Sequence, residues 1–222
     1  MKRKRLIAAV ACLILCLTGL AAAEDLSYQT LCDQEGLQSS EVVAWIEIPG
    51  ASFCEPIMRH PEDDAYYAKH DAHGVENEYG SLYVQAGYNA ADFSDPVTVV
   101  YGNSSSQDAP LGMLQQMYSG SFEEYSQIVL HTPDGRKEYV VFAAIPYTSI
   151  HVLHYYDFSI ERKFNSFFDS VFSTRALAMH LDEDNRPIFG QDHVLILSTG
   201  LRGDPLRRYL VLAREAGNDL GQ

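Results

Sequence analysis

Two cysteines and eight histidines supply most of the reactive side chains in this 222-residue chain beyond its first 23 residues. The thiols of Cys32 and Cys54 can act as nucleophiles beside a base, or they can pair as a disulfide in an oxidising compartment. Closing that loop would stabilise the fold by about 3 kcal/mol, and two separate, partly buried thiols fit the sequence equally well. Six of the histidines show no spacing typical of a metal site (His60, His70, His73, His151, His154 and His180). One local cluster, His70 and His73 with Asp71, is explained equally well by a polar loop. We therefore predict no metal and no cofactor.

Short runs of β-branched and aromatic residues indicate that most of the chain forms strands. The first predicted strand is Val42–Ile48, and Pro49-Gly50 ends it. The segment Thr132-Pro133-Asp134-Gly135 predicts a turn, because proline presets φ and glycine accepts the left-handed conformation, so the strands beside it should form a hairpin. The other predicted strands are Gly80–Val84, Val97–Tyr101, Ile128–Thr132, Glu138–Ile145, Val194–Ser198 and Tyr209–Ala213.

A helix is predicted between the late strands. Its apolar residues recur at i, i+3, i+4, i+7 and i+8, a spacing typical of a helix face that packs on a core (Phe164, Phe167, Phe168, Val171 and Phe172). Ser159 is the predicted N-cap, with Glu161 in the first turn. Residues 24–41 predict one or two further short helices. Many short strands with one helical insertion favour a mostly β barrel or sandwich.

The N-terminus has the pattern of a targeting segment. Lys2-Arg3-Lys4-Arg5 precedes 18 uncharged residues that end in Ala21-Ala22-Ala23. This is the order of a secretory signal peptide, and the apolar run, about 27 Å long as a helix, also suffices for a signal anchor. Both readings stay open, and both place residues 24–222 outside the cytoplasm, in contact with a membrane only through residues 1–23.

The charge and composition exclude two classes of protein. After residue 23 the chain carries 12 basic and 30 acidic side chains, a formal charge of −18. Such a surface repels phosphate backbones, so nucleic acid is not an expected partner. The 24 Phe and Tyr residues are too many large apolar side chains for a disordered chain.

Several segments follow one another in a specific order. They are Val43–Gly50, Pro56–Met58, Gly80–Val84, Ser94–Gly102, Thr132–Gly135, Val140–Ala143, Leu195–Thr199 and Arg207–Arg214. In this order they resemble a class B sortase over roughly residues 40–214. The resemblance implies an eight-stranded sortase-type β-barrel with N-terminal helices and one helix in the connection before the seventh strand. We accordingly expect a signal segment at 1–23, a helical segment at 24–41, the barrel at 42–214 and a tail at 215–222.

Sortases cleave the sorting signal of a surface protein at a Thr–Gly or Thr–Asn bond, hold the acyl group as a thioester and transfer it to an amine. In the family pattern the catalytic histidine follows Tyr-Gly, where this chain has Asn103. The catalytic cysteine follows Leu-Ser-Thr, where this chain has Gly200, and the family arginine matches Arg208. An asparagine has no usable pKa near neutrality, so it cannot shuttle a proton. Glycine offers no atom on which a thioester could form.

Substitute nucleophiles are few. Ser198 lies two positions before Gly200 and shares its face of an extended strand, but a hydroxyl needs a base to become nucleophilic. Cys54 is the other candidate, although the resemblance places it far from the nucleophile's position. His131 and His193 are interpreted as histidines satisfied by structural partners.

The peptide groove implied by the resemblance is altered. Ala68 stands where the family commonly has a leucine that lines the groove, and Ser198 and Thr199 are further groove candidates. The sequence thus predicts a non-catalytic, sortase-like protein at the surface of a Gram-positive cell, which binds a sorting-signal-like peptide, a surface protein or an active sortase. The alternatives are a sortase that uses a substitute nucleophile and a purely structural module.

Overall fold

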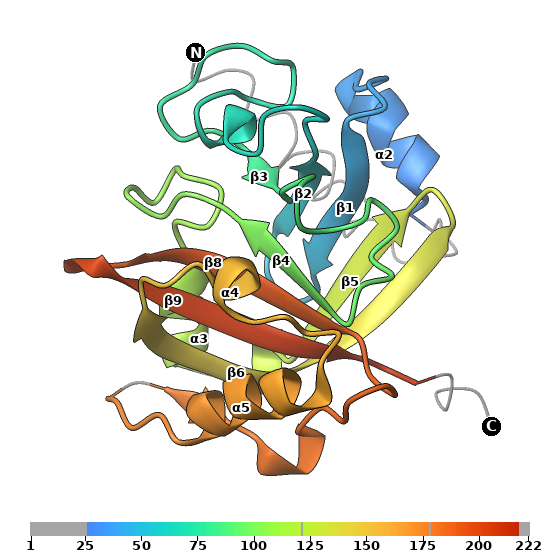
Figure 1. Cartoon of the computed structure of the whole chain (residues 1–222). Coiled ribbons are helices and arrows are strands. Elements are labelled where there is room, and N and C mark those ends of the chain that lie inside the picture. The colour runs from blue at the N-terminus through green and yellow to red at the C-terminus, as the bar shows by residue number, and fades with distance from the viewer. Residues whose placement is uncertain (1–25, 121, 178, 218–222) are drawn as a thin grey trace, which may run out of the picture.

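The computed structural model describes residues 26–217, apart from 121 and 178. Sixteen elements follow along this part of the chain (Figure 1). They are α2 (Tyr28–Glu35), β1 (Val42–Ile48), β2 (Phe53–Met58), η1 (Tyr66–Ala68), β3 (Leu82–Tyr83), β4 (Val97–Tyr101), α3 (Leu114–Ser119), η2 (Phe122–Tyr125), β5 (Gln127–Thr132), β6 (Gly135–Thr148), α4 (Val152–Tyr155), α5 (Glu161–Phe172), β7 (His180–Leu181), η3 (Glu183–Asn185), β8 (Val194–Leu201) and β9 (Asp204–Glu215).

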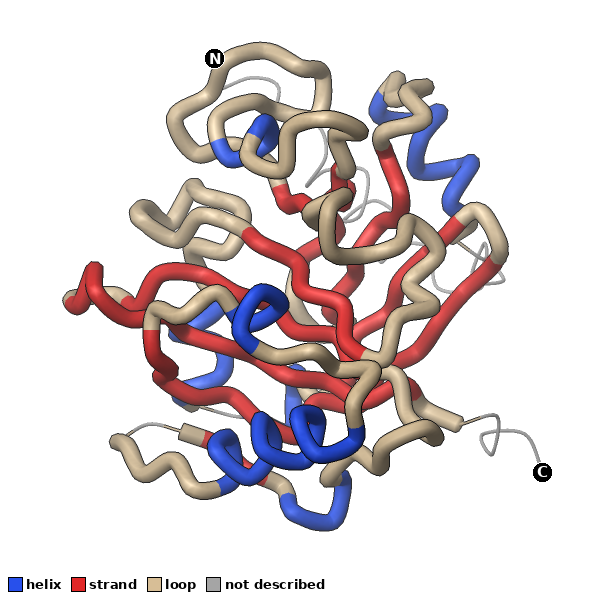
Figure 2. The backbone as a smooth tube through the Cα atoms, viewed as in Figure 1, coloured by secondary structure: helices blue, strands red, loops and turns tan. Residues whose placement is uncertain are grey.

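Eight strands close into a barrel, and a ninth extends it. The strand order is β5-β1-β2-β3-β4-β8-β9-β6-β7, and an additional β5–β6 pairing joins the ends of the ring. Figure 2 shows the strands in the middle of the molecule with helices around them. β7 pairs only with β6 and lies outside the ring. This confirms the predicted eight-stranded barrel. In chain order β8 is the seventh barrel strand, and the connection before it contains α4 and α5.

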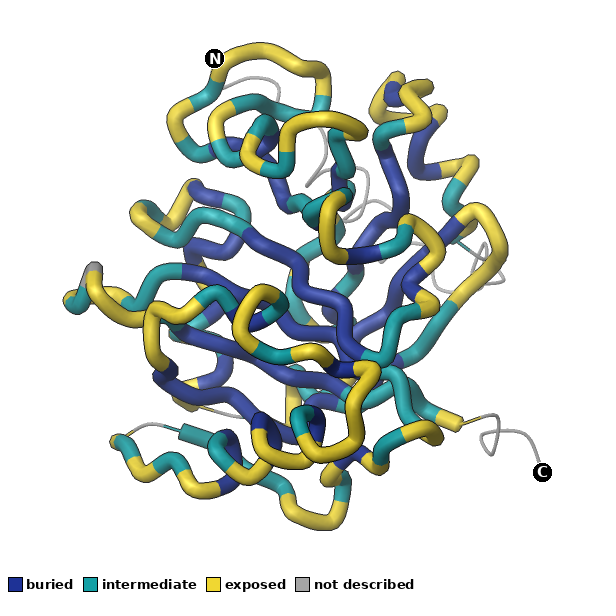
Figure 3. Tube along the Cα trace, viewed as in Figure 1, coloured by how far each residue is buried: buried dark blue, intermediate teal, exposed yellow. Residues whose placement is uncertain are grey.

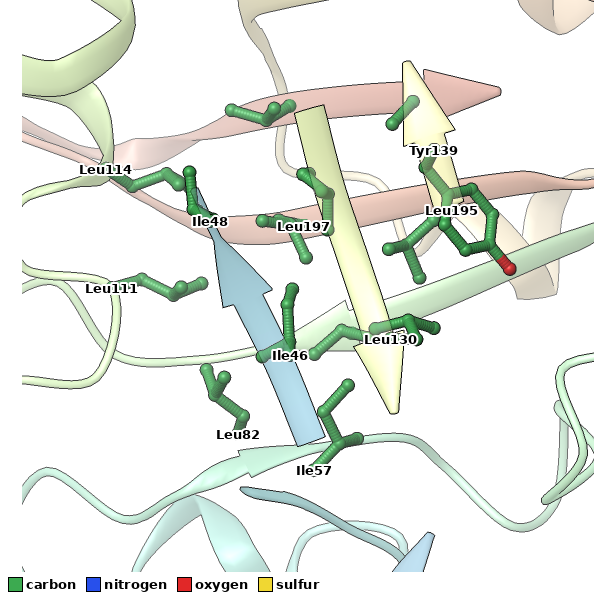
Figure 4. Packing of buried hydrophobic residues seen from close by; sticks show 14 of the residues in the cluster. Ile46, Ile48, Ile57, Leu82, Leu111, Leu114, Leu130, Tyr139, Leu195 and Leu197 are labelled. Carbon is green, nitrogen blue, oxygen red and sulfur yellow. The ribbon is translucent and has the colours of Figure 1, made fainter. Parts of the chain in front are cut away.

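The barrel interior is filled by one face of each strand. Side chains alternate between the two faces of a strand, so Ile46 and Ile48 of β1 meet Leu195 and Leu197 of β8 inside the ring (Figure 4). The alternate residues of β8, such as Ile196, pack on the outer face. Both faces of the central strands are therefore buried (Figure 3). This explains why these strands are apolar along their length rather than at every second residue.

The phenylalanine-rich helix covers the outer face of the barrel. All five predicted stripe residues of α5 are buried in one cluster with β4, β6, β8 and β9, which confirms their packing role. The predicted N-cap is wrong by one residue, because Ile160 occupies that position and makes no side-chain cap. Ser159 is engaged earlier, since its backbone N–H and its hydroxyl both donate to the Asp157 carboxylate, at 3.0 and 2.6 Å.

The N-terminal helix α2 lies beside β1 and completes a smaller core on the outer surface (Figure 1). Ser27 caps it through a hydrogen bond from the Thr30 amide to its hydroxyl, at 3.2 Å. Cys32 on α2 is a buried free thiol that accepts a hydrogen bond from the Trp45 indole at 3.3 Å, so the disulfide to Cys54 is not formed. The predicted signal segment lies outside the described residues. No helix between residues 26 and 217, with 121 and 178 set aside, combines the length and apolarity needed to cross a bilayer.

Candidate functional site

Three neighbouring strands bring the predicted reactive positions together. β4 runs parallel to β8 with Tyr101 opposite Ser198, and β9 runs antiparallel to β8 with Leu210 opposite Ser198 and Arg208 opposite Gly200. Opposite residues point to the same face of a sheet, as do residues two apart on one strand. Tyr101, Ser198, Gly200, Arg208 and Leu210 therefore share the outer face of the barrel.

A small pocket opens on this face. Its volume is about 110 Å³, and it lies between the strands and the start of the β6–β8 connection. The lining residues are Tyr101, Thr148, Ser149, Ile150, His151, Val152, Ser198, Arg208 and Leu210. Two larger hollows, of about 400 Å³ over α5 and about 360 Å³ beside residues 26–29, do not touch Asn103, Gly200 or Arg208.

Gly200 stands in open space beside the pocket. A Cβ atom built there would meet only the Ser104 hydroxyl within 4 Å, at 3.7 Å. The same hydroxyl donates to the Gly200 carbonyl at 2.8 Å. A Cβ atom therefore has room at this position.

Asn103 serves its own loop. Its side-chain oxygen accepts a hydrogen bond from the Ser105 amide at 2.7 Å, and its carbonyl accepts one from the Leu111 amide at 2.8 Å. It is half-buried and does not line the pocket. An amide bound in this way holds the turn after β4, and it does not titrate near neutral pH.

Close contacts join β4 and β8 where β4 ends. The Gly102 amide donates to the Ser198 carbonyl at 3.2 Å, and the buried Thr199 hydroxyl donates to the Gly102 carbonyl at 2.7 Å. A Cβ at Gly102 would lie 2.6 Å from Leu82 Cδ2 and 2.8 Å from Leu111 Cγ. Thr199 therefore points away from the pocket and fixes the strands rather than contacting a ligand.

Arg208 supplies the positive charge of the pocket. Among the residues that the structure describes, none forms a hydrogen bond or an ion pair with its side chain. Its charge acts on Tyr83, Tyr101 and His151. Burial raises the pKa of Tyr101 well above its ordinary range, so its phenol stays protonated and can donate. That buried hydroxyl has no hydrogen-bond partner among the described residues.

His151 is the site residue that sequence reasoning missed. It follows β6 in the chain and reaches the pocket because the β6–β8 connection folds back across β8. Its Nδ1 accepts a hydrogen bond from the His154 amide at 3.1 Å, and its Nε2 lies 2.8 Å from Gln85 Oε1. Nε2 must therefore carry the proton and donate it. Burial, and then the nearby His154, lower the pKa of His151, which keeps the ring neutral.

Comparisons with known proteins identify the architecture. A mutant form of Clostridium perfringens sortase B matches with a TM-score of 0.73 and 17% identity, over 98% of this chain and 99% of that one. Sortase B from Bacillus anthracis matches with a TM-score of 0.72 and 19% identity, over 98% of both chains. A Staphylococcus aureus sortase B–substrate complex matches at 0.71 and 17%, over 97% and 94%. This chain has the class B sortase fold. No family model and no curated protein matches the sequence.

Within the sortase fold, the remaining predicted residues lie away from the pocket. Ala68 ends η1 and does not line it. Cys54 lies on β2, opposite Glu47 of β1. The Glu47 carboxylate lies 2.9 Å from Nε2 of His131 on β5, the strand on the other side of β1. Glu47 therefore lies between the thiol and the imidazole. His193 Nδ1 lies 3.0 Å from the Asp95 carbonyl. Both His131 and His193 thus have structural partners, as predicted.

The described residues offer little for a metal ion. Between residues 26 and 217, excluding 121 and 178, no group of three or more His, Cys, Asp or Glu side chains is placed to hold one. The chemistry that the pocket offers is hydrogen-bond donation. Besides His151, the lining residues with side-chain donors are Arg208, Tyr101, Thr148, Ser149 and Ser198.

Proposed function

We propose that this protein is a non-catalytic member of the sortase fold that binds a sorting-signal-like peptide without cleaving it. The peptide would lie on the outer face of β4, β8 and β9, with one residue in the 110 Å³ pocket. The partner would be a surface protein that carries such a segment, or an active sortase that handles the same segment. We further propose that residues 24–222 work outside the cytoplasm, because the N-terminus has the pattern of a signal segment.

One observation carries the absence of catalysis. Gly200 presents no side chain beside Arg208, and the strand pairing leaves room for one. Covalent catalysis by a sortase requires a thiolate at that point and a base beside it. The position that matches the base holds Asn103, whose amide is bound in its own turn.

Ser198 does not repair the loss. It shares the pocket with His151, which is the arrangement that a serine nucleophile would need. However, both ring nitrogens of His151 are occupied, Nδ1 by an amide donor and Nε2–H by the Gln85 acceptor. A neutral imidazole in this tautomer has no free lone pair to take the Ser198 proton.

Two facts support retained binding. The pocket is open, and Arg208 still faces it without a protein partner among the described residues. The structurally similar S. aureus protein is described in complex with its substrate. A fold that keeps a charged, unfilled pocket after losing its nucleophile is more consistent with ligand binding than with a purely structural module.

The test separates binding from cleavage. The purified protein is incubated with a fluorogenic peptide that spans a Thr–Gly bond, and products and covalent adducts are measured by mass spectrometry. We expect neither. The same peptide, titrated by NMR, should shift resonances near Ser198, Thr199 and Arg208.

The controls use charge-matched variants. Arg208→Gln should weaken peptide binding, whereas Arg207→Gln removes the same charge from an exposed neighbour outside the pocket and should not. Cleavage at an enzymatic rate that Ser198→Ala or Cys54→Ala abolishes would establish an enzyme instead. An absence of binding by wild type would leave a structural module.

A further inference from the structure

The pocket beside Arg208 is built for an anion, and the following inference rests on the proposed function. Besides His151, five of its lining residues carry a side-chain hydrogen-bond donor: Arg208, Tyr101, Thr148, Ser149 and Ser198. Tyr101 is 91% buried, and its hydroxyl is one of three buried side-chain polar atoms left without a hydrogen-bond partner among the described residues. A buried donor without an acceptor costs about 1–3 kcal/mol, so a ligand that supplies the acceptor gains that amount.

The charges around the pocket leave Arg208 uncompensated. His151 also lines the pocket. Its ring is neutral, and its Nε2–H already donates to Gln85 Oε1. Asp64 is the acid whose charge acts on both Tyr101 and His151. Its carboxylate accepts a hydrogen bond from the Gly87 amide at 3.0 Å, and it does not line the pocket. Arg208 is therefore the one lining residue of this pocket that carries a full charge, and that charge is positive.

The size of the pocket selects the kind of group. A volume of about 110 Å³ equals the space of roughly three to four waters, against about 300 Å³ or more for pockets that enclose whole small molecules. A pocket of this size accepts the terminal group of a bound peptide more readily than a residue from the middle of that peptide. A peptide carbonyl brings one neutral oxygen, whereas a carboxylate brings two charged ones, enough for a bidentate guanidinium and a phenol together.

We propose that the pocket binds the free C-terminal carboxylate of a peptide, as found on a sorting signal that has already been cut after its threonine. The protein would then recognise the hydrolysed product of a sortase-type reaction in preference to the intact signal. Gly200 fits this role, because a side chain at that position would take up space next to Arg208.

The test compares two peptides that differ in one group. Acetyl-Ala-Ala-Ala-Thr with a free carboxylate and the same peptide with a C-terminal amide are titrated against the purified full chain by NMR or calorimetry. We expect the acid to bind about 10- to 100-fold more tightly, as for a hydrogen-bonded charge. Arg208→Gln should abolish the difference, and Arg207→Gln should preserve it.

Tyr101→Phe provides a variant that should fold normally, because it removes only an unsatisfied buried hydroxyl. It should reduce the preference for the acid about 3- to 10-fold without lowering the melting temperature. Equal binding of acid and amide would overturn the carboxylate proposal while leaving peptide binding intact. If neither peptide binds, and the longer peptide that spans the Thr–Gly bond does not bind either, the proposed function fails as well.

Discussion

Adding a methyl group should have opposite effects at two glycines of the site. At Gly200 the added Cβ would lie 3.7 Å from the Ser104 hydroxyl, an ordinary contact, and φ is not in the left-handed region. At Gly102, also without a positive φ, it would lie 2.6 Å from Leu82 Cδ2 and 2.8 Å from Leu111 Cγ. The backbone tolerates alanine at both positions, so packing decides the difference.

The magnitudes follow from these contacts. Glycine in a strand costs about 0.5–1 kcal/mol relative to alanine, because it loses more backbone freedom on folding. Gly200→Ala should therefore raise the free energy of unfolding by that amount, or the melting temperature by about 1–4 °C for a chain of this size. Gly102→Ala should lower the free energy of unfolding by about 1–3 kcal/mol, the usual cost of overpacking a core.

The assay is urea unfolding followed by circular dichroism, with both variants and the wild type measured together. The m-value should stay constant, so that the midpoints report stability alone. Destabilisation of Gly200→Ala by more than 1 kcal/mol would show that the space beside Arg208 is not open. A neutral Gly102→Ala would refute the close packing of Leu82 and Leu111 against Gly102.

Three further predictions concern acid stability, the support of β4 and the side chains at positions 103 and 200. The His131 hydrogen bond lowers the pKa of Glu47 below its ordinary value near 4.5, so the pair stabilises the fold above that value and the contribution is lost as the pH falls through the lowered pKa. Glu47→Gln should therefore cost about 1 kcal/mol at pH 7, and urea midpoints should show no such cost at pH 2 to 3. Asn89→Ala leaves two buried backbone groups of β4 without their partner and should lower the free energy of unfolding by about 2–4 kcal/mol in the same urea assay. Asn103→His combined with Gly200→Cys should create a thiol that reacts with iodoacetamide faster than Gly200→Cys alone, with the difference vanishing below about pH 5, and equal rates would show that the imidazole does not reach the thiol.

The sequence predicts best the elements whose signals are local. β1 and β4 begin and end where the sequence predicts, because each is an apolar run between turn residues. The hairpin at Pro133-Asp134 also forms, with Gly135 at φ 130°. β8 and β9 extend beyond their predictions into the polar residues that join them, since hydrogen bonding between the two strands continues where apolar patterning has stopped.

Site residues that lie close together in the sequence were predicted, and one that lies far from them was missed. Gly200 and Arg208 meet because one hairpin carries both, and a strand register can be inferred from a sequence. His151 enters the same pocket from a connection that must first fold back across β8. No local pattern encodes that return. In the structure, residues 149–152 directly follow β6, whose last two residues pair with Arg207 and Arg208, and this pairing sets where the connection begins.

The contacts that shape the site are separate from the atoms that would catalyse. Two hydrogen bonds hold the ends of β4 and β8 together. The Thr199 hydroxyl donates to the Gly102 carbonyl, and the Ser104 hydroxyl donates to the Gly200 carbonyl. None of these bonds uses the side chain of residue 200, and the bond from Ser104 ends on its backbone. The side chain at position 200 therefore contributes no bond here, whereas removing the Thr199 hydroxyl would cost the part-buried Gly102 carbonyl this donor, about 1 kcal/mol. A site held by backbone contacts in this way does not depend on the side chain at position 200 for its shape.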